Sequence, residues 1–157
     1  MPALKEDIDD LDAALSSIVQ TMKRPRTWEV LTRRADLTID RPGAIILGIL
    51  VLQPGNWRLH DLAERLSVEA PTITRKIQQL ELAGLVYRER DEKDGRAFSV
   101  RISEKGRIVA RKIETAQRQI LEAALQDWPS TDRQQFIKLS KRFGDDLDQQ
   151  YKQTPPK

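Results

Sequence analysis

The sequence predicts a mainly α-helical protein that also contains one small β-hairpin, which is an α+β fold. Apolar residues recur every three or four positions along most of the chain, as in amphipathic helices. Residues 85–102 instead form two short segments of strand-like composition around a charged loop. Proline and glycine separate the elements without forming a long linker, so we expect residues 1–157 to make a single domain.

Composition excludes several classes of protein. Hydrophobic residues make up 39% of the chain and charged residues 32%, which suits a globular domain rather than a membrane protein. The longest apolar run, residues 44–52, is too short to cross a bilayer, which takes about 20 residues. The acidic N-terminus lacks a signal pattern, so we expect a cytoplasmic protein. With no cysteine and one histidine, His60, we predict neither a metal site nor a cofactor.

The first third of the chain predicts three helices. Apolar positions from Ile8 to Met22 form one helical face, which Pro25 ends or kinks. A second helix should cover residues 28–35. Asp40 is then a good N-cap for a third helix that begins at Pro42 and runs to about residue 52. Isoleucine and valine dominate this segment, so periodicity alone leaves a strand open. The cap favours a helix, apolar nearly all round and therefore buried at the centre of the domain.

Two short helices joined by a four-residue turn follow. The first should cover residues 59–66, and the second should begin at Pro71 and end at Gly84. In the second helix Ile73, Ile77 and Leu80 share one face. The opposite face is mostly polar, and Lys76 lies at its edge. Its members are Pro71, Thr72, Arg75, Gln78 and Gln79. This arrangement is typical of a helix-turn-helix.

The remaining segments predict a β-wing and two further helices. Strands at residues 85–90 and 97–102 flank a charged loop, and Ser103 should cap a long helix after them. Trp128 and Pro129 break that helix. Thr131 with Gln134 predicts a capping box for a last helix that ends near residue 149. Residues 85–112 hold nine basic and five acidic residues, a balance of +4 that would suit a phosphate-facing surface.

Residues 57–106 resemble the DNA-binding core of the MarR (multiple-antibiotic-resistance regulator) family. The resemblance rests on ordered motifs, which are DLAERL, PTITRKIQQLE, AGLV, Asp94-Gly95-Arg96 and ISEKG. It covers about a third of the chain closely. Arg58 departs from the pattern, because many members place a Ser or Thr helix cap there. The resemblance implies a winged helix-turn-helix lobe at residues 40–103, with dimerisation helices at residues 1–38 and 104–149.

The resemblance also implies a function. A homodimer would bind a near-palindromic operator in double-stranded DNA, with one recognition helix in each major groove and the wing arginine, Arg96, in the minor groove beside Asp94. The implied DNA-binding residues are Pro71, Thr72, Arg75, Lys76, Gln79, Asp94 and Arg96. The family also implies a repressor that a small aromatic or lipophilic effector releases from DNA, with Trp28, Leu31 and Arg34 near the effector.

Two other classes of function compete with this interpretation. A winged-helix module that binds proteins and has lost operator binding would be expected to replace Arg75, Lys76 and Arg96 with neutral or acidic residues, yet all three are basic. An enzyme would need a nucleophile, a phosphate loop or paired carboxylates, and the sequence shows no such motif. We therefore expect no catalytic activity and no association with membranes.

Overall fold

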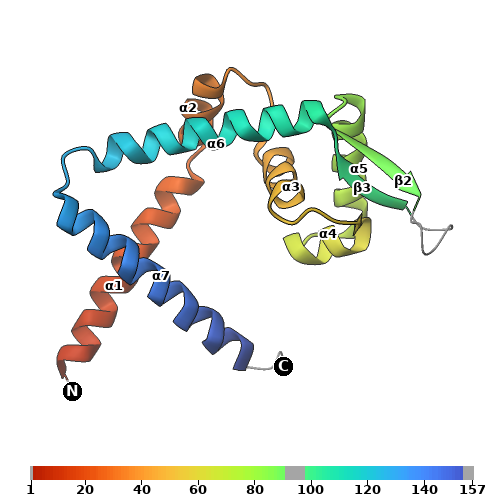
Figure 1. The fold of residues 1–157 in the computed structure, drawn as a ribbon. Coiled ribbons are helices and arrows are strands. Elements are labelled where there is room, and N and C mark those ends of the chain that lie inside the picture. The colour runs from red at the N-terminus through yellow and green to blue at the C-terminus, as the bar shows by residue number, and fades with distance from the viewer. Residues whose placement is uncertain (1, 91–97, 154–157) are drawn as a thin grey trace. The chain divides into compact units, whose positions relative to one another are not determined.

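The computed structural model describes residues 2–90 and 98–153. Asp94 and Arg96, which the sequence places in the wing, lie outside these described residues. In chain order (Figure 1) the elements are α1 (Pro2–Lys23), α2 (Pro25–Ala35), α3 (Arg41–Leu52), β1 (Trp57–Arg58), α4 (Leu59–Leu66), α5 (Ala70–Leu82), β2 (Val86–Arg90), β3 (Phe98–Ile102), α6 (Glu104–Leu125) and α7 (Ser130–Gln153). This content confirms the mainly α class with a small β-wing.

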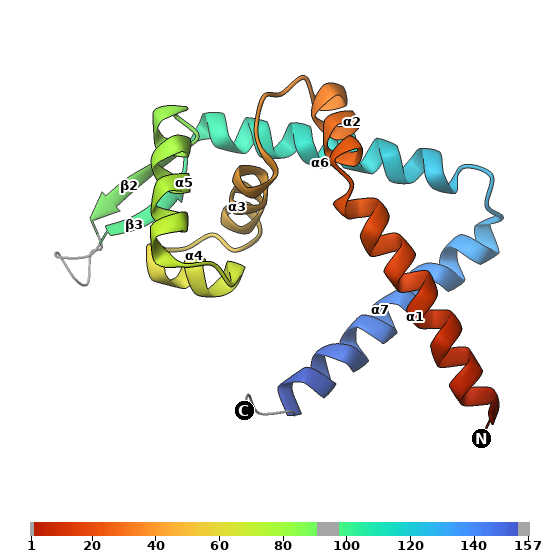
Figure 2. The ribbon, with the colours of Figure 1, turned by 180° about the vertical axis from the view of Figure 1, so that it is seen from behind.

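The chain divides into two compact units, residues 1–117 and 118–157. In the first unit α3, α4 and α5 gather beside the β2–β3 hairpin, as both views show (Figures 1 and 2). Their apolar side chains form one core with the strands, in which Leu47, Leu62, Ile77 and Val100 are fully buried. The helix-turn-helix and the wing are thus parts of one packed lobe.

α3 forms because a cap and a proline start it where the sequence predicts. Asp40 Oδ1 accepts a hydrogen bond from the Gly43 backbone N–H at 3.0 Å, and Pro42 stands in the first turn. The helix lies in the core, as expected. It is not buried all round, however, because Ile45 and Leu52 are exposed.

The wing is part of a three-stranded antiparallel sheet with the order β1-β3-β2. Val86 pairs with Ile102 and Arg90 with Phe98, which confirms the hairpin. β1 was not predicted, because two residues are too few to show alternation; it pairs Trp57 with Val100. β3 is therefore the central strand.

Other boundaries differ from expectation at the helix ends. α2 begins at Pro25 rather than at residue 28, because proline is well tolerated in a first helical turn. The predicted capping box of Thr131 and Gln134 is wrong. α7 begins one residue earlier, at Ser130, and the Pro129 carbonyl accepts a hydrogen bond from Arg133 N–H at 3.1 Å. α7 also continues beyond residue 149, to Gln153.

The joint between α5, the wing and α6 is closely packed. α5 is followed by Gly84 in the left-handed conformation, with φ of 71°. Ser103 Oγ donates to the Gly84 carbonyl at 2.7 Å and accepts from Gly106 N–H at 3.0 Å, which confirms the predicted Ser103 cap. A Cβ added at Gly106 would lie 2.1 Å from the Leu85 carbonyl oxygen and 2.8 Å from Ile102 Cγ1. Only glycine fits there without a shift of backbone.

We predict that Gly106→Ala destabilises the protein by about 1–3 kcal/mol, because α6 must move away from Leu85 to admit the methyl group. Urea unfolding at a fixed protein concentration measures this change. Gly48→Ala in α3 is the matched control. Its added Cβ meets no atom within 4 Å, so helix propensity should stabilise the variant by about 0.5–1 kcal/mol. Equal unfolding midpoints for Gly106→Ala and the unmodified protein would contradict the packing at this joint.

Candidate DNA-binding surface

α5 has one buried and one exposed face, as the sequence predicts. Ile73, Ile77 and Leu80 are buried in the core, which fixes how the helix is turned. The opposite face is exposed and carries Pro71, Thr72, Arg75, Gln78 and Gln79. α5 follows α4 after a short turn in which Ser67 takes the left-handed conformation, with φ of 51°. The helix-turn-helix thus presents a polar, largely uncharged face with a single arginine.

Arg75 and Lys76 have different environments although they are adjacent in the sequence. Arg75 is exposed and makes no ion pair or hydrogen bond within residues 2–90 and 98–153. The Lys76 side chain is only 20% exposed and forms an ion pair with Asp40. Its ammonium also donates to Gln79 Oε1 at 2.7 Å. Of these two cations, Arg75 is therefore the one available to a ligand.

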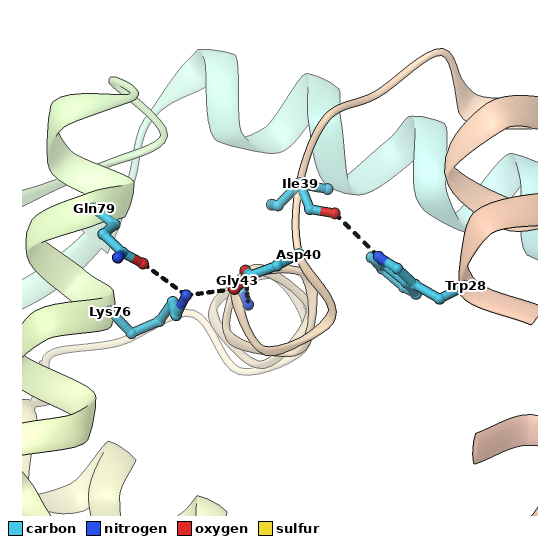
Figure 3. Close-up of polar contacts among 6 residues, drawn as sticks. All are labelled: Trp28, Ile39, Asp40, Gly43, Lys76 and Gln79. Atoms are coloured by element: carbon cyan, nitrogen blue, oxygen red, sulfur yellow. Dashed lines mark hydrogen bonds and ion pairs between the residues drawn. The ribbon is translucent and has the colours of Figure 1, made fainter. Parts of the chain in front are cut away.

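Asp40 links α3 to α5. Its two carboxylate oxygens have separate partners, because Oδ1 caps α3 and Oδ2 faces Lys76 (Figure 3). The neighbouring Ile39 carbonyl accepts a hydrogen bond from Trp28 Nε1 at 3.1 Å, so α2 is held to the same segment. The sequence identifies Asp40 as a cap but gives no signal for its contact with Lys76, which lies 36 residues away.

Carboxylates neutralise part of the wing's positive charge. Arg88 Nε lies 3.0 Å from Glu81 Oε2 of α5, and Arg101 pairs with Glu89 on the neighbouring strand. Arg111 pairs with Glu104 along α6. Among the seven basic residues of segment 85–112 that the structure describes, three thus have acidic partners. The balance of +4 already includes Glu89 and Glu104, so only Glu81, which lies outside the segment, reduces the positive charge further.

The residues suggested for an effector lie on α2. Trp28 and Leu31 are half-buried and Arg34 is exposed. A hollow lies beside them at the end of α2, lined by Thr32, Arg33, Asp36, Leu37 and Thr38. The hollow includes none of the three suggested residues, and the Trp28 indole N–H is already bonded to Ile39.

The residues near the start of α4 have structural roles. His60 is exposed in the first turn. Asp61 accepts a hydrogen bond from Arg58 N–H at 3.1 Å, which is the half of a capping box that the third helical residue supplies. Across the described ranges no group of three His, Cys, Asp or Glu residues could hold a metal ion. In the same ranges no helix combines the length and the apolar content needed to cross a membrane.

Helices near both ends of the chain expose apolar faces. In α7 no residue is buried, and Phe136 contacts Trp128 edge to face with ring centroids 5.6 Å apart. The exposed large apolar residues of α7 are Phe136, Ile137, Leu139, Leu147 and Tyr151. Those of α1 are Ile8, Leu11, Leu15, Ile18, Val19 and Met22. Each of these side chains is more than a third exposed.

Sequence comparison finds two similarities. Residues 49–98 match the model of the MarR family. An 89-residue segment is 27% identical to the uncharacterised HTH-type transcriptional regulator YxaD of Bacillus subtilis. That segment is 57% of this chain and 62% of the relative, so the chain spans less than two thirds of the relative's length.

Structural comparison extends the similarity to most of the chain. A MarR family protein from Bacillus stearothermophilus has a TM-score of 0.78 and 26% identity, over 92% of this chain and 97% of that one. A mutant of MepR from S. aureus, bound to an oligodeoxyribonucleotide, has a TM-score of 0.60 and 18% identity, covering 87% and 97%. The PcaV transcriptional regulator from Streptomyces coelicolor, in complex with its natural ligand, has a TM-score of 0.57 and 21% identity, covering 83% and 89%.

The similarities to MepR and PcaV show a shared fold and nothing more. The family match, by contrast, falls on the helix-turn-helix and the first wing strand. The match at residues 49–98 and the fold shared over nine tenths of the chain together show a winged-helix fold similar to that of MarR family proteins.

Proposed function

We propose that the protein is a homodimeric, sequence-specific DNA-binding transcription regulator without catalytic activity. The outward face of α5 is the observation that carries this proposal. That face is polar, its orientation is fixed by buried residues, and Arg75 projects from it without a partner in the described chain. A helix of this kind can enter the major groove and present donors to base edges. MepR, which shares the fold, is seen bound to an oligodeoxyribonucleotide.

Each candidate residue has a proposed role. Thr72, Arg75 and Gln79 contact base edges or phosphates from α5, where Pro71 starts the helix. Lys76, at the edge of that face, contributes positive charge near the backbone. Arg96 enters the minor groove from the wing, and Asp94 orients it.

The exposed faces of α1 and α7 support a dimer. Apolar stripes of this length rarely stay open to water in a monomer, and a second copy of the chain would cover them. Residues 1–38 and 104–149 then form the dimerisation helices, and residues 40–103 form the DNA-binding lobe of a single domain. Two recognition helices should meet half-sites about 34–36 Å apart.

Release by a small molecule is part of the proposal. PcaV, of the same fold, is seen with its natural ligand. A small aromatic or lipophilic effector bound near Trp28, Leu31 and Arg34 would reach α5 through the hydrogen bond to Ile39 and the pair of Asp40 with Lys76. The protein would then repress transcription until the effector binds.

Selection of bound duplexes from a random DNA pool, at two salt concentrations, tests the function. Enrichment of a near-palindrome with half-sites one helical turn apart is the expected result. Binding that is weak, unselective and steeply dependent on salt would contradict it, and would favour a winged-helix module that binds proteins.

We expect Arg75→Ala to weaken binding to the selected operator by about 1–3 kcal/mol and to relax the preference at one base pair in each half-site. Titration of labelled operator and of random duplex measures both effects. Arg26→Ala, which removes an exposed arginine from α2, is the control and should bind as the unmodified protein does. An equal loss on operator and random DNA would make Arg75 a phosphate contact instead.

Arg96→Ala should reduce operator affinity and flatten the preference for A·T pairs flanking each half-site, because a narrow minor groove attracts arginine. Repeating the selection with this variant shows the flanking preference directly. An unchanged preference for A·T pairs at the flanking positions, together with unchanged operator affinity, would rule out a role for the wing arginine.

Sedimentation should give a dimer of the 18.1 kDa chain at micromolar concentration. Ile18→Glu places a charge on the exposed face of α1 and should shift the protein toward monomer. Leu52→Glu changes an equally apolar, 82% exposed residue of α3 and should leave the dimer intact. A stable monomer of the unmodified protein would disprove the dimer.

A further inference from the structure

The ion pair of Asp40 and Lys76 has a consequence for a third residue, Gln79. The Lys76 ammonium lies between the Asp40 carboxylate and the Gln79 carboxamide (Figure 3). Lys76 is mostly buried, whereas Gln79 is exposed on the outward face of α5. Asp40, whose side chain is 52% exposed, and Lys76 thus form a relay that ends at Gln79, a residue that a bound duplex could touch.

The chemistry of the relay fixes the orientation of the Gln79 amide. An ammonium group can only donate hydrogen bonds, so the amide group facing it must be the oxygen. Lys76 Nζ lies 2.7 Å from that oxygen. This bond uses one of the two lone pairs of the oxygen, so the Nε2 amino group, which only donates, is the part of the carboxamide that is entirely free for a ligand. Gln79 is thus held as a donor.

This orientation bears on base recognition. A glutamine that reads adenine uses both amide atoms, because it accepts from N6 and donates to N7. A donor alone matches guanine better, since both guanine N7 and O6 are acceptors in the major groove. To bind adenine, the Gln79 oxygen would have to accept from adenine N6 and from the Lys76 ammonium together, and the crowding of these two donors disfavours adenine.

We propose that Asp40 is a specificity-determining positioning residue, which acts through Lys76 to hold Gln79 as a donor and so selects guanine over adenine at one position in each half-site. The proposal rests on the proposed function as a sequence-specific DNA-binding protein. Asp40 suits this role because its place is set from two sides. Its own Oδ1 caps α3, and the adjacent Ile39 carbonyl is bonded to Trp28.

Three substitutions test the relay in the full-length protein, again by selection from a random DNA pool. Gln79→Ala identifies the base pair that Gln79 reads, since the preference there should be lost. Lys76→Met removes the ammonium and frees the amide oxygen. Asp40→Asn keeps the cap of α3, because asparagine and aspartate cap equally well, but it no longer pairs with the ammonium.

We expect Lys76→Met and Asp40→Asn to lower the ratio of guanine to adenine at that position about tenfold, within the range of one bidentate contact. Lys76→Arg, which still only donates, should restore the guanine preference. The thermal unfolding midpoint of Asp40→Asn should match that of the unmodified protein. A merely structural role of Asp40 would change this midpoint or the overall affinity, but not the base chosen at one position.

Two results would overturn this proposal and leave the proposed function in place. One is an enriched palindrome that Gln79→Ala does not alter at any position. The other is a guanine preference that persists in Lys76→Met or in Asp40→Asn. If the unmodified protein enriches no sequence, both the proposed function and the relay's role in specificity fail.

Discussion

The close approach of α6 to the Leu85 carbonyl is the constraint on which the winged lobe depends. Gly106 has no side chain to separate the two segments, and Ser103 bonds both to Gly106 and to the turn at Gly84. Lys105 adds a bond to the Ala83 carbonyl at 2.7 Å. The end of α5, the last wing strand and the start of α6 therefore meet at one point. This joint therefore ties the end of α5 to the last wing strand.

Much of the fold could be predicted from the sequence because its signals are local. The caps at Asp40 and Ser103 and the apolar face of Ile73, Ile77 and Leu80 each involve residues within one or two turns of a helix. β1 could not be predicted, since Trp57 becomes part of a strand only through its pairing with Val100, 43 residues later. The boundary errors at Pro25 and Ser130 are of one to three residues.

In the candidate site too, the sequence predicts what depends on neighbouring residues but not the contacts between residues that are far apart in the chain. Helical geometry alone placed Thr72, Arg75 and Gln79 on the exposed face of α5. It could not show that Lys76 is bound by Asp40, or that Glu81 and Glu89 neutralise Arg88 and Arg101. A count of charges along the sequence cannot distinguish a cation that has an acidic partner from one that has none. In the folded chain Arg75 is unpaired among the described residues, whereas its neighbour Lys76 is shielded.

Residues 118–153 bury no side chain, although helices in proteins owe most of their stability to the packing of an apolar face. In the proposed dimer, mass action therefore couples the folding of α7 to the concentration of the chain. Newly made chains below the dissociation constant would leave this segment open to proteases, whereas paired chains would be protected. The half-life of the regulator would then rise with its own abundance, so that a small change in synthesis produces a larger change in the amount of active protein.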